Sequence, residues 1–220
     1  MLREIITTAD GSKTIQLKDW NEQYHSKHGA IQEAYHVFIR HGLNLFQNQA
    51  IKVLEIGFGT GLNALITLLE SSKLDLTITY RGVEAYPVSA EELSQLNYVS
   101  ELRAEDFQEQ FQKMHQSSWE ENILISDRFT LYKELIDFRE INAQNCYDLV
   151  YFDAFGARVQ PELWTEEVFT IMYKALNKGG VLVTYAAKGS VRRAMQKVGF
   201  EVERLPGPPG KREMLRATKS

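Results

Sequence analysis

The chain has 220 residues, and 44% of them are hydrophobic, which is enough to bury the core of one domain. Its 25 Lys and Arg residues against 29 Asp and Glu residues give a net charge of −4, which by itself argues against nucleic acid as a partner. A single cysteine, Cys146, excludes an internal disulfide and a cysteine-rich zinc site. Residues 1–14 lack a signal-peptide core and no apolar run approaches the roughly 20 residues of a membrane span, so we expect a cytoplasmic protein that makes no membrane contact.

The first 50 residues predict a small extension of a larger domain. Strand-like pieces lie around Glu4 to Thr8 and Thr14 to Leu17, and a helical stretch rich in Tyr and His runs from Gln32 to Phe46. We expect residues 1–50 to form a cap and residues 51–220 to form one α/β domain.

A glycine-rich turn follows the next apolar strand. Gly57, Gly59 and Gly61 alternate with Phe58 and Thr60 between that strand and an apolar helix. Glycine permits unusual backbone dihedrals there and leaves the backbone amides and the helix start open to a ligand. The turn therefore predicts a nucleotide-like cofactor, although a tight turn that holds no ligand is the alternative reading.

The spacing of the glycines narrows the choice of cofactor. A Walker loop would have Lys and then Ser or Thr after Gly61, where this chain has Leu62 and Asn63. A dinucleotide-binding fingerprint would have its third glycine at Leu62. The observed pattern, with the acidic Glu55 just before it, resembles the first motif of class I S-adenosyl-L-methionine-dependent methyltransferases.

A second acidic residue ends the following strand. Residues Thr77 to Val83 predict that strand, and Glu84 comes directly after it, which completes a βαβ unit. A carboxylate at this rim of a parallel sheet can accept hydrogen bonds from the hydroxyls of a ribose. A solvated charge at a strand end is the alternative.

The remaining elements continue the alternation of strands and helices. A rigid turn from Pro206 to Gly210 interrupts the last strand pair. The expected fold is α/β, with a Rossmann-like, mostly parallel seven-stranded sheet and an antiparallel C-terminal hairpin, as in class I methyltransferases. The expected elements are strands at 123–127 and 147–152, a helix at 165–176, a strand at 181–186, a helix at 190–198 and strands at 200–204 and 213–217.

Asp153 is the candidate catalytic residue. It follows the apolar strand that ends at Phe152, and a residue in that place of this fold faces the methyl group being transferred. A carboxylate suits an amine acceptor, because it can take up a proton or stabilise the positive charge that grows on nitrogen. Alternatively, Asp153 binds backbone amides of its own loop.

Several motifs together resemble one methyltransferase family over nearly the whole chain. That family is the methyltransferase domain of the bifunctional tRNA 5-methylaminomethyl-2-thiouridine biosynthesis protein. The motifs are Tyr24 to Ser26, Gly29 to Phe38, Gly57 to Asn63, Phe152 to Phe155, Pro161 to Trp164, Gly189 to Arg193, Gly199 to Phe200 and Gly210 to Leu215.

The resemblance implies an activity and a set of site residues. The activity is methyl transfer from S-adenosyl-L-methionine to the amine of 5-aminomethyl-(2-thio)uridine at the tRNA wobble position, with Asp153 as the catalytic carboxylate. The cofactor residues would be Glu55, Gly57, Phe58, Gly59, Thr60, Gly61, Asn63 and Glu84. The substrate residues would be Phe155, Pro161, Trp164, Lys188, Gly189, Arg192, Arg193, Lys211 and Arg212.

Two features qualify these assignments. Core packing is the alternative role for Trp164. The segment Lys188 to Ser190 departs from the family, which has a small residue before the glycine and an aromatic residue after it.

The bifunctional members carry a flavin-dependent oxidoreductase domain after the methyltransferase. Because this chain ends at Ser220, it resembles the stand-alone form. We therefore expect neither FAD nor a metal, and we expect upstream wobble-uridine modification enzymes to supply the substrate.

The chain can bind tRNA in spite of its negative net charge if its basic residues are concentrated in one region. Residues 181–220 contain nine basic and three acidic residues, a net charge of +6, whereas the rest of the chain carries −10. A basic C-terminal region can contact phosphates, although a solvated helix face is the alternative. The competing functions are a class I methyltransferase or aminopropyltransferase acting on a small amine, and a non-catalytic tRNA-binding module.

Overall fold

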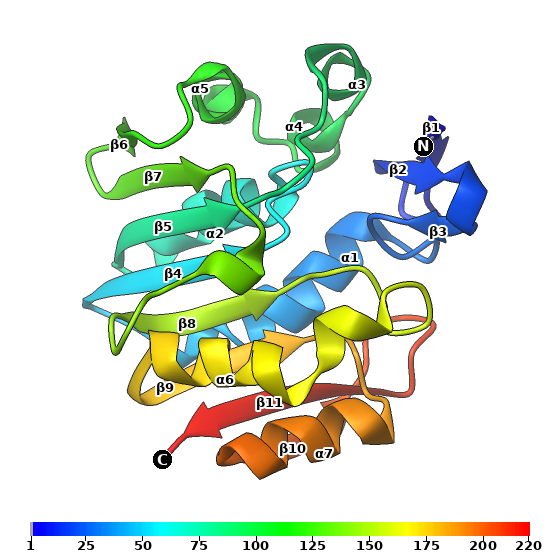
Figure 1. Cartoon of the computed structure of the whole chain (residues 1–220). Helices are drawn as coiled ribbons and strands as arrows, with labels where there is room; N and C mark the ends of the chain where they lie inside the picture. Colours follow the sequence, from blue (N-terminus) through cyan, green and yellow to red (C-terminus); the bar gives the residue numbers. More distant parts are fainter. Residues whose placement is uncertain (1) are drawn as a thin grey trace.

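The computed structural model describes residues 2–220, and Met1, part of the expected extension, lies outside them. The chain forms two sheets (Figure 1). The small sheet contains β1 (Arg3–Thr7), β2 (Lys13–Leu17) and β3 (Glu22–Gln23), all antiparallel. The large sheet contains β10 (Phe200–Pro206), β11 (Glu213–Lys219), β9 (Leu176–Thr184), β8 (Tyr147–Phe152), β4 (Ala50–Ile56), β5 (Thr77–Val83), β7 (Phe129–Glu134) and β6 (Asn122–Ser126), in that spatial order.

The large sheet confirms the Rossmann-like class. Strands β9, β8, β4, β5 and β7 are parallel, β10 and β11 form the antiparallel hairpin, and β6 pairs antiparallel with β7. The sheet has eight strands instead of the expected seven. Strand β7 is the element that we did not predict, because its sequence FTLYKE mixes charged and apolar residues and its buried Lys133 hides the apolar face.

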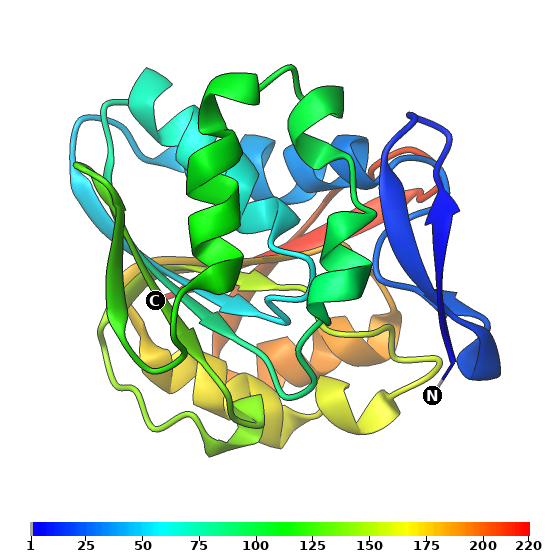
Figure 2. The ribbon, with the colours of Figure 1, turned by 90° about the horizontal axis from the view of Figure 1, so that it is seen from above.

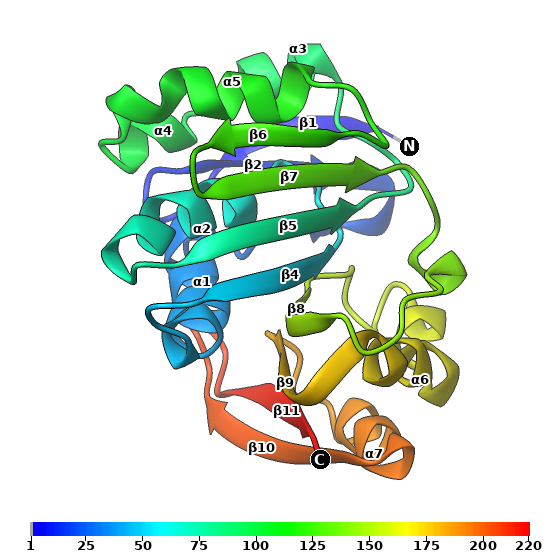
Figure 3. The same ribbon diagram turned by 90° about the vertical axis from the view of Figure 1, so that its left-hand side faces the viewer.

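Period-2 alternation in the strands divides their side chains between two cores. Val53 and Tyr151 belong to one core, while the adjacent residues Leu54 and Phe152 belong to the other. The first core packs against α1 (Ala30–Ala34), α2 (Leu62–Lys73), α4 (Tyr98–Glu101) and α5 (Gln108–Gln116), and the second against α6 (Glu166–Ala175) and α7 (Gly189–Val198). Figure 3 shows α6 and α7 on the opposite side of the sheet from α1 and α2.

The predicted helix from Gln32 to Phe46 is wrong as one element. Helix α1 continues into a π-helical turn, η2 (Tyr35–Arg40), and a separate 3-10 turn, η3 (Leu43–Leu45), follows. The break falls at Gly42, where a Cβ atom would lie 2.5 Å from the carbonyl oxygen of Phe38. These residues pack on the large sheet, so the division of the chain at residue 50 stays a proposal.

We define the cap as residues 2–28, a shorter segment than the cap of residues 1–50 expected from the sequence. The cap contains η1 (Lys18–Trp20) as well as strands β1 to β3. It stands beside the sheet edge toward which the arrowheads of β5, β7 and β8 point (Figures 1 and 2). The short elements α3 (Ala90–Ser94), η4 (Glu105–Phe107), η5 (Phe138–Glu140) and η6 (Pro161–Trp164) complete the fold. No helix within residues 2–220 is long and apolar enough to cross a membrane.

Candidate active site

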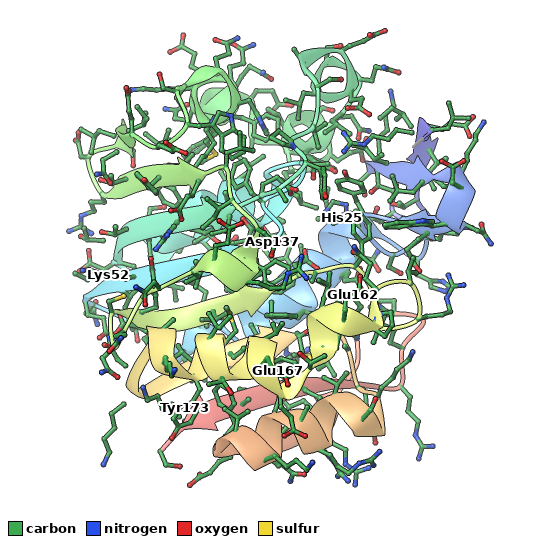
Figure 4. The ribbon with its side chains drawn as sticks, viewed as in Figure 1. His25, Lys52, Asp137, Glu162, Glu167 and Tyr173 are labelled. Atoms are coloured by element: carbon green, nitrogen blue, oxygen red, sulfur yellow. The ribbon has the colours of Figure 1, made fainter. Side chains whose placement is uncertain are left out.

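A cavity of about 690 Å³ opens where the parallel strands end. Its walls come from the cap, from the turns after β4 and β5, and from the loops after β7, β8 and β9. Three lining residues, His25, Asp137 and Glu162, mark its sides in Figure 4 and belong to three distant parts of the sequence. Carboxyl ends of strands are the usual ligand site of such sheets.

The glycine turn has the backbone that its sequence predicted. Gly57, Gly59 and Gly61 have φ angles of +85°, +49° and +71°, a region that disfavours other residues. A Cβ atom at Gly57 would lie 2.8 Å from the carbonyl oxygen of Asp153. Gly57 and Gly59 line the cavity, together with Phe58 and Thr60. Gly61 lies outside the lining, where a Cβ atom would come within 2.9 Å of the His115 ring.

Glu84 joins the two turns that border the cavity. Its two carboxylate oxygens accept hydrogen bonds from the backbone N–H of Gly59, at 3.0 Å, and of Tyr86, at 2.8 Å. The carboxylate is therefore fixed beside the glycine turn and faces the same cavity.

A hydrogen-bonded chain of buried groups supports the floor of the cavity. Asn63 Nδ2 donates to Glu55 Oε1 and to Asp153 Oδ2, both at 2.9 Å. The hydroxyl of Tyr80 donates to Glu55 Oε2 at 2.8 Å. Only 1% of Glu55 is exposed, and burial holds the pKa of its carboxyl well above the usual value. Asn63 thus fixes the position of Asp153 from below.

Asp153 combines a fixed position with a shifted pKa. Burial raises the pKa of its carboxyl to about 7, the charge of Glu33 adds to the rise, and the Asn63 hydrogen bond and the charge of Lys211 oppose it. A carboxyl group with such a pKa exchanges protons near neutral pH, as a general base must.

The residues of the predicted pocket motif Pro161 to Trp164 lie in different surroundings, and only some of them line the cavity. Pro161 is exposed and lies outside the lining, whereas Glu162 and Leu163 line the cavity. Trp164 is 5% exposed, packs on Phe152 and donates its indole N–H to the carbonyl oxygen of Phe155 at 2.8 Å. It therefore supports the loop that carries Phe155, which does line the cavity.

The predicted basic residues lie outside the cavity lining. Lys211 turns inward, forms an ion pair with Glu33 and holds its Nζ 3.8 Å from the ring centre of Tyr185. The other predicted residues lie around the start of α7 or in the turn before β11. Both places are at the end of the sheet where the cavity opens, because Leu215, near the start of β11, pairs with Thr184, the last residue of β9. These residues are Lys188, Gly189, Arg192, Arg193 and Arg212.

Sequence reasoning missed the lining residues that the cap supplies. These residues follow no apolar parallel strand, so the signal that revealed Glu84 and Asp153 was absent for them. Among them, His25 is buried, its Nδ1 lies 2.8 Å from Thr14 Oγ1, and burial lowers its pKa to about 4. The missed lining residues include Arg3, Trp20, Gln23, Tyr24 and His25 in the cap, and Asp137, Gln160 and Tyr185 elsewhere.

Within residues 2–220, no group of three or more His, Cys, Asp or Glu side chains is arranged to hold a metal ion.

A family model for S-adenosyl-L-methionine-dependent methyltransferases matches residues 96–220. The chain is 29% identical to the tRNA 5-methylaminomethyl-2-thiouridine biosynthesis bifunctional protein MnmC of Hydrogenovibrio crunogenus, over 96% of this chain and 33% of that protein. It is 30% identical to the protein of the same name from Idiomarina loihiensis, over 89% of this chain and 35% of that protein. The chain thus spans about a third of the length of these relatives.

Two solved structures extend the comparison. The crystal structure of MNMC2 from Aquifex aeolicus has a TM-score of 0.81 and 27% identity, covering 100% of this chain and 70% of that one. Spermidine synthase from Thermotoga maritima has a TM-score of 0.56 and 15% identity, covering 100% of this chain and 72% of that one, which shows a shared fold alone.

Proposed function

Because the chain belongs to the family of S-adenosyl-L-methionine-dependent methyltransferases, we propose that it methylates the amine of 5-aminomethyl-(2-thio)uridine at the wobble position of tRNA. The similarity to MnmC proteins supports this substrate. The observation that carries the chemistry is Asp153, held by Asn63 beside the glycine turn with a pKa of about 7. The product would be 5-methylaminomethyl-(2-thio)uridine.

The proposed cofactor site fits S-adenosyl-L-methionine. Gly57, Gly59 and Glu84 border the cavity, and the absence of a side chain at Gly57 lets the turn lie directly against the Asp153 carbonyl. Glu84 would bind the ribose, and Glu55 with Asn63 would support the turn from below. When bound, the cofactor supplies a methyl group on a sulfonium centre that a nucleophile can attack.

Asp153 would act as the general base. A primary amine is mostly protonated near neutral pH and attacks carbon only when its lone pair is free. The Asp153 carboxylate would accept that proton and become neutral, which frees the lone pair of the amine. Asn63 would keep one carboxylate oxygen fixed, so that the other stays available to the amine.

The exposed basic residues would contact the RNA backbone. Lys188, Arg193 and Arg212 lie near the edge of the sheet where the cavity opens, and phosphates there would bring the wobble nucleotide to the cavity. A base in an anticodon loop is unstacked at low cost, so it can enter a pocket.

The proposed reaction also indicates which cofactors are needed and where the substrate comes from. Methyl transfer involves no net oxidation and Asp153 can free the amine, so we infer that neither FAD nor a metal takes part. The aminomethyl group must come from an earlier modification reaction on the tRNA. A tRNA substrate would place the enzyme in the cytoplasm.

The test uses labelled S-adenosyl-L-methionine with tRNA that carries 5-aminomethyl-2-thiouridine at the wobble position. We expect label in that nucleoside and none in unmodified tRNA. Putrescine and spermidine serve as competing small amines. If label enters the polyamines but not the tRNA, the chain is a small-amine transferase and the proposal is wrong. If the cofactor and tRNA bind without any transfer, the chain is a binding module.

A further inference from the structure

The cavity has two chemically different halves. The glycine turn, Glu84 and Asp137 border one half, where the strands β4, β5 and β7 end. The cap and the loop after β8 border the other half, and Tyr24 of the cap reaches the boundary, because a Cβ atom at Gly59 would lie 3.3 Å from its ring. Asp153 lines the cavity and reaches the glycine turn through its own carbonyl oxygen, so it belongs to the boundary between the halves.

Three aromatic side chains gather in the second half. The ring centre of Phe155 lies 5.2 Å from that of Tyr24 and 6.0 Å from that of Trp20, and both pairs are edge to face, at 86° and 87°. All three side chains line the cavity. Aromatic faces in a partly open cavity bind flat, unsaturated ring systems by stacking.

Two amide side chains complete this half. Gln23 of β3 and Gln160, just before η6, both line the cavity, and neither side-chain amide has a hydrogen-bond partner among the residues that the structure describes. An amide presents a donor and an acceptor side by side. That pair complements the N3–H and carbonyl oxygen of uracil. Cytosine can pair with the same amide rotated by 180°, whereas a methyl group on N3 of uracil would block the pairing.

The two sides of the aromatic group are tied together. Arg158, in the loop that carries Phe155, donates to the Glu22 carboxylate of the cap at 2.9 Å. The indole of Trp164 holds the Phe155 carbonyl oxygen from the opposite side. The aromatic side chains are therefore positioned before any ligand arrives, which lowers the cost of ordering them on binding.

We propose that the cap forms the binding site for the acceptor base. Trp20, Tyr24 and Phe155 contact its ring, and Gln23 and Gln160 hydrogen-bond to the edge that carries N3. The identity of the acceptor as a nucleobase rests on the proposed function. The assignment of its recognition to the cap rests on the lining of the cavity.

The test measures binding, so that it does not depend on turnover. The protein, saturated with S-adenosylhomocysteine, is titrated by calorimetry with two anticodon stem-loop RNAs that carry 5-aminomethyluridine (the uridine RNA) or its N3-methylated form at the wobble position. We expect the wild type to prefer the uridine RNA by about tenfold or more, because the N3-methyl group removes a hydrogen bond and leaves buried polar groups unpaired. The variant Gln23→Ala/Gln160→Ala should lose most of this preference.

The aromatic contacts predict a different pattern. Trp20→Ala should weaken both RNAs by a similar factor, about tenfold, because stacking does not distinguish the two pyrimidines. Trp20→Phe, which keeps an aromatic face, should restore most of the affinity. Gln32→Ala, an exposed residue of α1 outside the lining, serves as the matched control and should bind both RNAs like the wild type.

Unchanged S-adenosylhomocysteine affinity shows that each variant is folded. A preference for the uridine RNA over the N3-methylated RNA that survives in the double glutamine variant, or that is missing in the wild type, would overturn the proposal. The same conclusion follows if Trp20→Ala binds as tightly as Trp20→Phe. If the wild type binds the uridine RNA selectively but transfers no methyl group to it, the proposed function fails while the base site stands.

Discussion

At the scale of single residues, the site contains the buried carboxyl group of Glu55 and the half-buried carboxyl group of Asp153, which lines the cavity. Glu55 and Asp153 share the Asn63 amide, and both have raised pKa values because burial disfavours their charged forms. Burial of these carboxyl groups therefore lowers the stability of the fold, while it gives the proposed base Asp153 a pKa near neutrality. This arrangement has consequences for activity and stability that differ in their pH dependence.

Asp153 should control the pH dependence of methyl transfer. Because its pKa is about 7, kcat/KM for the acceptor should rise with pH through neutrality, as the carboxylate forms. Asp153→Ala should reduce turnover by about 10²–10⁴-fold, while the affinity for S-adenosylhomocysteine stays nearly constant. A variant with unchanged turnover would show that Asp153 is not the base.

The same carboxyl group should destabilise the fold at alkaline pH. Its pKa is about 7 in the folded protein and near 3.8 when unfolded, so the protonated form favours the fold and this contribution is lost between those pH values. Asp153→Asn, which stays neutral, should therefore raise Tm at pH 8 relative to the wild type. The difference should shrink as the pH approaches 4. Equal Tm values at pH 8 would contradict the raised pKa.

Glu33 and Lys211 should shift the activity profile in opposite directions. The charge of Glu33 raises the pKa of Asp153 and that of Lys211 lowers it. Glu33→Gln should therefore move the acid limb of the kcat/KM profile to lower pH, and Lys211→Met should move it to higher pH. Lys211→Arg keeps the charge and should leave the limb in place. If both neutral variants shift the limb the same way, general distortion is the better explanation.

At the scale of elements, the turn after β4 lines the cavity on the side proposed for the cofactor. Gly57 has two separate reasons to be glycine, a φ of +85° and the Asp153 carbonyl oxygen 2.8 Å from a Cβ atom. Gly179, in β9, has only the first reason, since its φ is +77° and nothing lies within 4 Å of a Cβ atom there. The two positions allow backbone strain to be separated from close packing.

Gly57→Ala and Gly179→Ala form a matched pair. Both should lose on the order of 1–2 kcal/mol of stability from the left-handed backbone. Gly57→Ala should in addition weaken S-adenosylhomocysteine binding and methyl transfer, because the carbonyl of Asp153 or the turn must shift. Calorimetric titration and thermal unfolding measure the two effects. Similar loss of cofactor affinity in both variants would remove the special role of the turn.

The elements that the sequence predicted well are those with strong local patterns. Strands β4, β5 and β8 and helices α2, α6 and α7 have clear period-2, continuous apolar or helical repeats, and their type was confirmed. Strand β7 was missed because Lys133 occupies an inward position, where its Nζ donates to the carbonyl oxygens of His115 and Ser117. A buried lysine that finds its partners on α5 and the residue after it leaves no local signal.

At the scale of the whole molecule, charge is separated between the C-terminal region and the rest. The net charge of +6 over residues 181–220 contrasts with −10 elsewhere. Several of these basic residues are already paired, as Lys197 is with Glu166 at 2.7 Å. Arg193 and Arg212 are exposed and form no ion pair within residues 2–220, so they are the better candidates for phosphate contacts than the inward-facing Lys211.

The double variant Arg193→Ala/Arg212→Ala should weaken tRNA binding and flatten its salt dependence. Each lost phosphate contact should reduce the slope of log K against log salt by about 1. Lys197→Ala, which removes an already paired charge, is the control and should leave the slope nearly unchanged. An identical slope for the double variant and the wild type would place the RNA surface elsewhere.

The sequence by itself determined the residues of the proposed cofactor site. A left-handed turn demands glycine at each such position, and an apolar strand followed by an acidic residue places that residue at the sheet edge, so Gly57, Glu84 and Asp153 could be predicted locally. Only the tertiary structure decided the other half of the cavity. Trp20 and Tyr24 meet Phe155 across more than 130 residues of chain, and Lys211 meets Glu33 across 178. Such contacts depend on how the cap packs against the sheet, and no local pattern encodes that packing.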